Sequence, residues 1–188
     1  MNIETVVLSS LASVFFLILN VFLARYFGPK NYGSWSYFFA LLNIFFLISY
    51  LGINQSARKH VAEHKESATL FSVLKSSLKL RIIFSFLFAI FFFFFHQKLA
   101  TILNRPDFEI LFLLAVPLIF FRGIVEYFKF IFQGLHRLKY NFLVTVSEHG
   151  LRFLVALFVL PLFGSLASVV FSFNVAIIIT LVLGSFLF

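Results

Sequence analysis

Residues 110–132 read ILFLLAVPLIFFRGIVEYFKFIF, and only Arg122, Glu126 and Lys129 among them carry a charge. An apolar stretch of about 18 residues or more is long enough to cross the hydrocarbon core of a membrane as a helix. In lipid the backbone polar groups must be satisfied within the segment itself, which favours a helix. The stretch therefore predicts a membrane-spanning helix with charged residues inside it.

The rest of the chain has the same apolar character, because 62% of its 188 residues are hydrophobic and only 12% are charged. A soluble domain of this length needs more polar surface. We predict an all-α, polytopic transmembrane helical bundle that forms a single domain over residues 1–188. Residues 28–31 contain Gly28 and Pro29 and predict a tight turn, and residues 52–77 predict a polar, partly helical segment at the membrane surface. The six predicted spans cover residues 6–27, 32–51, 78–95, 110–132, 140–160 and 166–188.

The basic residues are divided unequally between the two ends of this predicted bundle, nine against four. Because basic loops remain in the cytoplasm, we predict a cell inner (plasma) membrane protein with both termini of this chain cytoplasmic. This rule and anionic lipid explain the net charge of +8, so membrane lipid is an expected partner and nucleic acid is not. The nine are Arg58, Lys59, Lys65, Lys75, Lys79, Arg81, Lys129, Arg137 and Lys139, and the four are Arg25, Lys30, Lys98 and Arg105.

Two of the predicted spans carry polar side chains at intervals of four, three and four residues, which places each set on one face of its helix. A charge at the centre of a bilayer costs roughly 2.5–3.5 kcal/mol. We therefore expect the two polar faces to point at each other or at a watery cavity. The sets are Arg122, Glu126, Lys129 and Gln133 in the fourth span, and Asn141, Thr145, Glu148 and Arg152 in the fifth.

Three basic and two acidic residues near the middle of the membrane leave one cation without a counterion. We expect Glu126 to pair with Arg122 or Lys129 along its own helix, and Glu148 to pair with Arg122 across helices. In one interpretation these charges only hold the helices together. In the other they form a cationic lumen for an anionic headgroup, since an Arg side chain can bind two phosphate oxygens. The candidate substrate-binding residues are Arg25, Arg122, Lys129 and Arg152, and the candidates for coupling or pairing are Glu126, Glu148 and His149, the last as a proton relay.

Three motifs resemble those of a known transporter family. LARYFGPKNYG occupies residues 23–33, LGINQSARKHVA occupies residues 51–62, and FQGL at residues 132–135 is followed by a basic residue and Tyr140. With the spacing of the spans, they make the chain similar to the polysaccharide and O-antigen (Wzx-like) flippases of the multidrug/oligosaccharidyl-lipid/polysaccharide exporter superfamily.

The resemblance implies a transporter without a cofactor, and not an enzyme. Members of that family have two helical bundles related by a pseudo-twofold axis. They move an undecaprenyl-pyrophosphate-linked sugar unit across the membrane by alternating access, driven by a cation gradient or the membrane potential. This chain supplies one bundle and ends inside an apolar stretch, so we expect the N-terminal lobe of a longer transporter. Its expected partners are the lipid-linked oligosaccharide, a second transporter half and a polysaccharide polymerase.

Other functions remain open at this stage. A drug or cation exporter of the same superfamily should carry unpaired acids in its lumen, and a non-transporting scaffold for a glycan synthesis complex should tolerate neutral residues there. His60, Glu63 and His64 match the H-x-x-E-H pattern of inverted zinc peptidases. That site requires a third ligand, so we expect a charged surface helix and no metal site. The absence of cysteine excludes disulfides and thiolate ligands.

Overall fold

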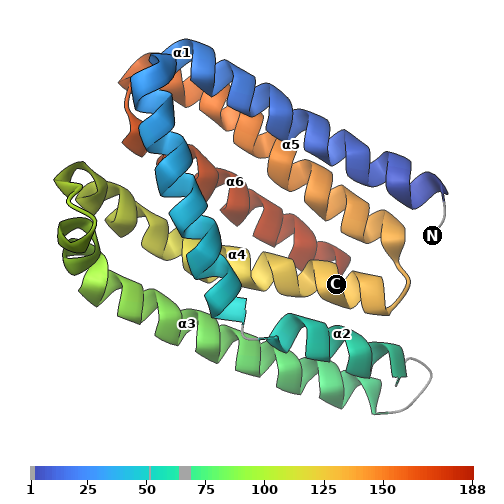
Figure 1. The fold of residues 1–188 in the computed structure, drawn as a ribbon. Coiled ribbons are helices and arrows are strands. Elements are labelled where there is room, and N and C mark those ends of the chain that lie inside the picture. The colour runs from blue at the N-terminus through green and yellow to red at the C-terminus, as the bar shows by residue number, and fades with distance from the viewer. Residues whose placement is uncertain (1–2, 51, 64–68) are drawn as a thin grey trace.

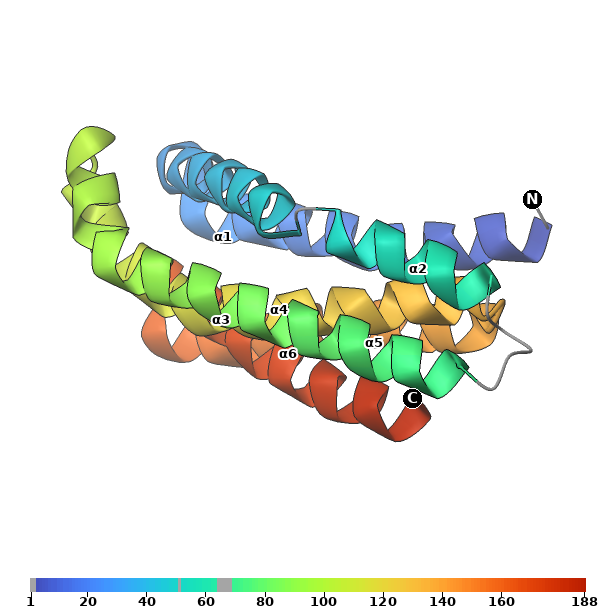
Figure 2. The same ribbon diagram turned by 90° about the horizontal axis from the view of Figure 1, so that it is seen from below.

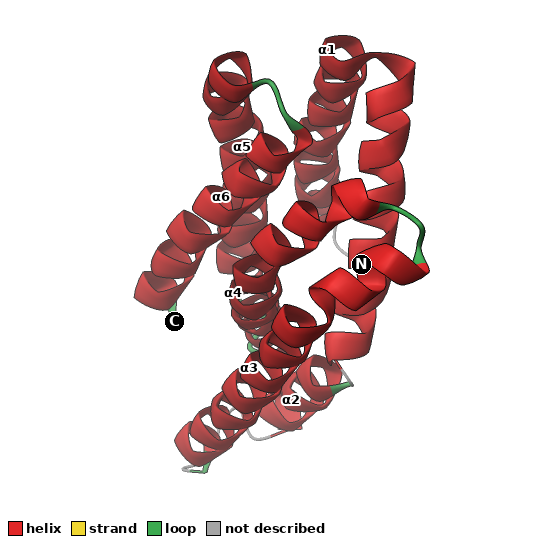
Figure 3. Ribbon diagram, turned by 90° about the vertical axis from the view of Figure 1, so that its left-hand side faces the viewer, coloured by secondary structure: helices red, strands yellow, loops and turns green. Residues whose placement is uncertain are grey.

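The computed structural model describes residues 3–50, 52–63 and 69–188, and this part of the chain contains helices and no strand. Five of its helices are long and apolar enough to cross a membrane, which confirms the predicted all-α polytopic bundle. Short connections join the helices (Figure 3). The elements are α1 (Ile3–Tyr50), α2 (Ile53–Glu63), α3 (Leu70–Ile102), the 3₁₀ turn η1 (Pro106–Phe108), α4 (Glu109–Gly134), α5 (Leu138–Phe163) and α6 (Leu166–Leu187).

Helix α1 is 48 residues long and bends at Gly28. At about 1.5 Å per residue it is about 72 Å long, more than twice the thickness of a hydrocarbon core. Gly28 adopts φ 70° and ψ 174°, a conformation essentially restricted to glycine, and Pro29 follows it. The bend divides α1 into a first arm (residues 3–27) and a second arm (residues 29–50), which match the first two predicted spans. A single non-helical residue, Gly28, joins the two arms, whereas the sequence predicted a turn over residues 28–31.

The helices form two layers. Figure 2 shows α1 and α2 on one side and α3, α4 and α6 on the other. The first arm of α1 runs beside α5, and the second arm crosses α4 (Figure 1). The same figure places α2, the α4–α5 turn and the C-terminal end of α6 at one end of the bundle, called here the α2 end. The bend of α1, η1 and the α5–α6 turn lie at the other end, called the kink end. The assignment of the α2 end to the cytoplasm stays a prediction.

Aromatic side chains fill the space between the second arm of α1, α3 and α4. Phe45 meets Phe92 edge-on at 5.0 Å between ring centroids, and Phe38 packs against Phe112 at 5.3 Å. Phe92 is fully buried, whereas Phe94 in the same run of five phenylalanines is 71% exposed. In this run Phe92 alone faces the core and its neighbours in sequence face outward, because successive residues of a helix point in different directions.

Two helices extend further than the sequence predicted. Helix α3 begins at Leu70 and ends at Ile102, where the prediction ran from 78 to 95. Its polar first turns are helical because they pack beside α2 and because the Ser77 hydroxyl contacts the Tyr127 hydroxyl at 2.8 Å. Helix α5 continues past Pro161 to Phe163. A proline so close to the C-terminus removes only one backbone hydrogen bond.

Candidate functional site

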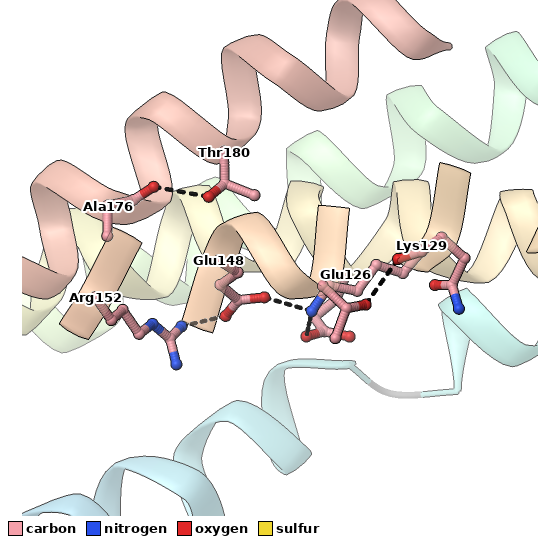
Figure 4. A network of polar contacts seen from close by, with 8 residues as sticks. Glu126, Lys129, Glu148, Arg152, Ala176 and Thr180 are labelled. Atoms are coloured by element: carbon pink, nitrogen blue, oxygen red, sulfur yellow. Dashed lines mark hydrogen bonds and ion pairs between the residues drawn. The ribbon is translucent and has the colours of Figure 1, made fainter. Parts of the chain in front are cut away.

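Four charged residues join α4 to α5, and they are called here the charge cluster: Glu126 and Lys129 on α4, and Glu148 and Arg152 on α5. The Lys129 Nζ donates to Glu126 Oε1 at 2.9 Å and also to the Glu148 carboxylate. The Arg152 guanidinium donates to the other oxygen of Glu148. Figure 4 shows these contacts between the two helices. The polar faces of the fourth and fifth predicted spans therefore meet, as their spacing predicted.

Three members of the charge cluster are buried, and the fourth, Glu126, is partly exposed. Lys129 is 7% exposed, Arg152 is 2% exposed and Glu148 is 1% exposed. Buried charges are stable only when they are paired and hydrogen-bonded. Glu148 lies at the centre of the cluster, because it accepts hydrogen bonds from cations on both helices. These contacts agree with the interpretation in which charges hold the helices together.

Arg122 forms neither of the ion pairs predicted for it. Within the described residues it has no ion pair, and its Nε is buried without a hydrogen-bond partner. Its guanidinium carbon lies 4.1 Å from the centre of the Phe46 ring, on the second arm of α1. The reason is that Lys129 occupies Glu126, while Lys129 and Arg152 share Glu148. Arg122 is therefore the uncompensated cation beside the charge cluster.

Aromatic rings accompany both arginines of the site. Arg152 lies 4.9 Å from the centre of the Phe173 ring on α6, and its Nε also lacks a hydrogen-bond partner. Cation–π attraction to a ring uses none of the N–H groups of a guanidinium. Arg122 and Arg152 therefore keep N–H groups that can bind oxygen atoms of an anion.

Two predicted site residues do not join the charge cluster. Arg25 is exposed on the first arm of α1, and no hydrogen bond or ion pair links it to the cluster in the described structure. His149 follows Glu148 in sequence but packs edge-on against Phe16 of α1 at 6.1 Å between ring centroids. Its Nδ1 is buried without a hydrogen-bond partner. The proton-relay role of His149 stays a prediction.

Arg81 is a buried charge that the sequence analysis assigned to the basic end of the bundle. It is 0% exposed, and its side chain donates to the carbonyl of Gly123 on α4 at 3.0 Å and to that of Ser49 on α1 at 2.8 Å. The Ser49 carbonyl lies in the last turn of α1, where helix carbonyls lack backbone partners and carry partial negative charge. Arg81 thus links α3 to both α1 and α4. Arg81 is the fourth residue of the predicted span 78–95, and this position was the sequence feature that could have indicated a buried charge.

The possible zinc motif gains no support from the arrangement of α2. His60 Nδ1 lies 3.4 Å from a Glu63 oxygen, and His64 lies outside the described residues. In the described ranges, no group of three or more His, Asp or Glu side chains is placed to hold a metal ion.

Comparison with known proteins places the chain in one family. The model of the family described as "Polysaccharide biosynthesis protein" matches residues 2–188. A search of curated proteins and a search of solved structures found no match to the chain. The five membrane-length apolar helices make this chain a membrane protein. The chain is therefore a membrane protein that belongs to the polysaccharide biosynthesis protein family.

Proposed function

We propose that the chain moves undecaprenyl-pyrophosphate-linked polysaccharide repeat units across the cell inner membrane by alternating access. Membership of the polysaccharide biosynthesis family supports a role in making or exporting polysaccharide. The observation that carries the transport proposal is Arg122, a cation that no carboxylate neutralises in the described structure. A lipid-linked pyrophosphate supplies the missing negative charge.

In this proposal Arg122 makes the first contact with the pyrophosphate. An isolated guanidinium within the membrane is costly, so an anion that binds it is held more tightly than at the surface of the protein. Arg152 offers its free Nε from α5. Lys129 is held by two carboxylates and keeps Glu148 in place for Arg152. Arg25, exposed near the bend of α1, is proposed to attract the headgroup earlier along its path.

The second arm of α1 is the proposed moving part. Phe46 on this arm lies over the Arg122 guanidinium, and the arm is joined to the rest of α1 through the single non-helical residue Gly28. A rotation of the arm about this residue would uncover Arg122. A second transporter half or a polysaccharide polymerase is the proposed partner that completes the path.

A scaffold role within a glycan synthesis complex is the second candidate, because the ion pairs among Lys129, Glu148 and Arg152 hold α4 against α5. A drug or cation exporter is less well supported, since both carboxylates of the charge cluster are paired with cations. The two main candidates differ in one respect: only transport requires the charge of Arg122.

The test measures which leaflet holds the lipid-linked glycan precursors in cells depleted of this protein. We expect precursors to accumulate on the cytoplasmic leaflet, and the wild-type chain with its partners to reverse this. Arg122→Glu should abolish the reversal while its amount in the membrane stays normal. Lys98→Glu is the matched control, because Lys98 is an exposed cation at the kink end of α3, and it should behave as wild type.

Normal export with Arg122→Glu would contradict the role of the cation. Absence of precursor accumulation after depletion would contradict flipping itself and favour the scaffold. Arg152→Glu is the less informative variant, because it also places an acid beside the buried Glu148 and disturbs the fold.

A further inference from the structure

An open groove of about 620 Å³ lies between α2 and the first turns of α3, at the α2 end of the bundle. Its lining includes hydroxyl groups from both helices, Ser56 on α2 with Ser72 and Ser76 on α3. The groove is built from other elements than the charge cluster of α4 and α5, and it is independent of the proposed transport function.

The groove is polar at one end and apolar at the other. Ser72 and Ser76 are exposed and lie one helical turn apart. Leu80, one turn further along α3, also lines the groove and is 50% exposed. The same face of α3 continues through Ile83 and Leu87, which are 42% and 55% exposed. The groove therefore begins among hydroxyl groups and ends where the apolar surface of α3 begins.

Lysines follow the polar end of the groove. Lys75 and Lys79 each lie three residues after a lining serine, so they occupy the neighbouring face of α3. Both are exposed, and neither forms an ion pair within the described ranges. On α2, Lys59 is exposed as well and lies 3.9 Å from Glu63. The polar end is thus positively charged, chiefly from the side of α3.

We propose that this groove binds an anionic phospholipid of the surrounding bilayer. The hydroxyls of Ser72 and Ser76 donate hydrogen bonds to the phosphate, and Lys75 and Lys79 supply the opposite charge. The acyl chains lie along the apolar face that starts at Leu80. Charge complementarity at one end and continuity with the lipid-facing surface at the other favour a lipid over a soluble anion or a protein.

The test compares lipid binding by the purified 188-residue chain and its variants, using native mass spectrometry with phosphatidylglycerol and zwitterionic phosphatidylcholine as probes. The wild-type chain should bind phosphatidylglycerol more tightly. The Lys75→Gln/Lys79→Gln variant should bind it about thirtyfold more weakly, since each basic residue near an anionic headgroup contributes about fivefold. Lys30→Gln/Lys98→Gln removes the same charge at the kink end and should change binding less than about twofold.

A second variant tests the groove itself at constant charge. Ser76→Trp places a bulky ring in the groove and should abolish binding of phosphatidylglycerol, whereas Ser76→Ala should weaken it only slightly. Because Ser76 is exposed, helicity measured by circular dichroism should be unchanged in both variants.

Three results would overturn the proposal. The first is an equal loss of binding in the two lysine pairs, which would indicate general charge attraction. The second is unaltered binding by Ser76→Trp. The third is full displacement of phosphatidylglycerol by inorganic phosphate at about 10 mM. This would show that the site recognises a soluble anion and that the acyl chains do not contribute to binding.

Discussion

At the scale of single residues, two arginines inside the membrane show how the chain manages charge. Arg152 gains a carboxylate from its own helix, whereas Arg81 is held by two backbone carbonyls and the nearby Tyr50 ring. The Ser49 carbonyl lies in the last turn of α1, where no backbone N–H group competes for it, whereas the Gly123 carbonyl lies within α4. These contacts offset part of the cost of burying Arg81 without an acid, and its Nη2 is buried without a hydrogen-bond partner in the described structure.

Gly123 makes the arrangement of Arg81 possible. A Cβ atom at this position would lie 2.2 Å from the Arg81 guanidinium and 2.5 Å from the Ser85 hydroxyl. We therefore expect Gly123→Ala to displace Arg81 from both carbonyls and to lower the free energy of unfolding by about 3 kcal/mol. Denaturant titration of the detergent-solubilised protein measures this change.

The control for Gly123→Ala is Gly150→Ala. Gly150 also lies within a long helix, and a Cβ there would meet nothing within 4 Å. Alanine favours a helix over glycine, so this control should raise stability by up to about 1 kcal/mol. An increase in stability in both variants would contradict the close contact between the Arg81 side chain and Gly123 of α4.

Among the elements, the hydropathy pattern predicted the order of the apolar segments, because each of them must be helical in lipid. It did not predict that the first two segments form one bent helix, so the described structure has five membrane-length helices where the sequence predicted six spans. The spacing of charges also predicted that α4 and α5 face each other. The partners of these charges could not be predicted. Whether Glu148 pairs with Arg122 or with Lys129 depends on the relative rotation and depth of two helices. The spacing of residues along the sequence does not specify either of these.

The position of Arg81 shows a second limit. A basic residue near the start of an apolar run is compatible both with a cytoplasmic loop and with a buried site. In the structure α3 starts at Leu70, eight residues before the predicted start. Arg81 therefore lies well inside the helix, where its side chain reaches the carbonyls of Ser49 and Gly123. Hydropathy did not predict the true start of α3, because its first turns are polar and lie outside the apolar run.

The bend of α1 gives a prediction at the same scale. Gly28 has φ 70° and ψ 174°, and alanine in such a conformation is strained by about 1–3 kcal/mol. Gly28→Ala should therefore lower stability and change the angle between the two arms. Spin labels on cysteines introduced at Leu17 and Leu47, exposed on the first and second arms, report the distance between the arms, and the natural chain has no cysteine to interfere.

Gly33→Ala serves as the comparison for the bend. Gly33 lies on the second arm in helical conformation, and a Cβ there meets nothing within 4 Å. It should leave the distance between the labels unchanged and preserve or raise stability. An unchanged distance distribution with Gly28→Ala as well would show that the bend does not depend on glycine.

Across the molecule, the two ends of the bundle differ in charge, and the structure narrows this difference. Arg81 and Lys129 are buried, and Lys65 lies outside the described residues. Six of the nine basic residues predicted for the cytoplasmic side therefore remain, against four at the kink end. The excess still lies at the α2 end, and the cytoplasmic location of that end stays a prediction of the positive-inside rule.

This orientation predicts which residues are reached from outside the cell. Single cysteines at Ser76 and Lys139 lie at the α2 end, and single cysteines at Gln97 and Asn104 lie at the kink end; all four positions are exposed. A thiol reagent that cannot cross the membrane should label only the kink-end pair in intact cells and all four after permeabilisation. The reverse pattern would place the basic end outside, and with it the lysines beside the lipid groove. The positive-inside rule would then not explain the charge distribution of this chain.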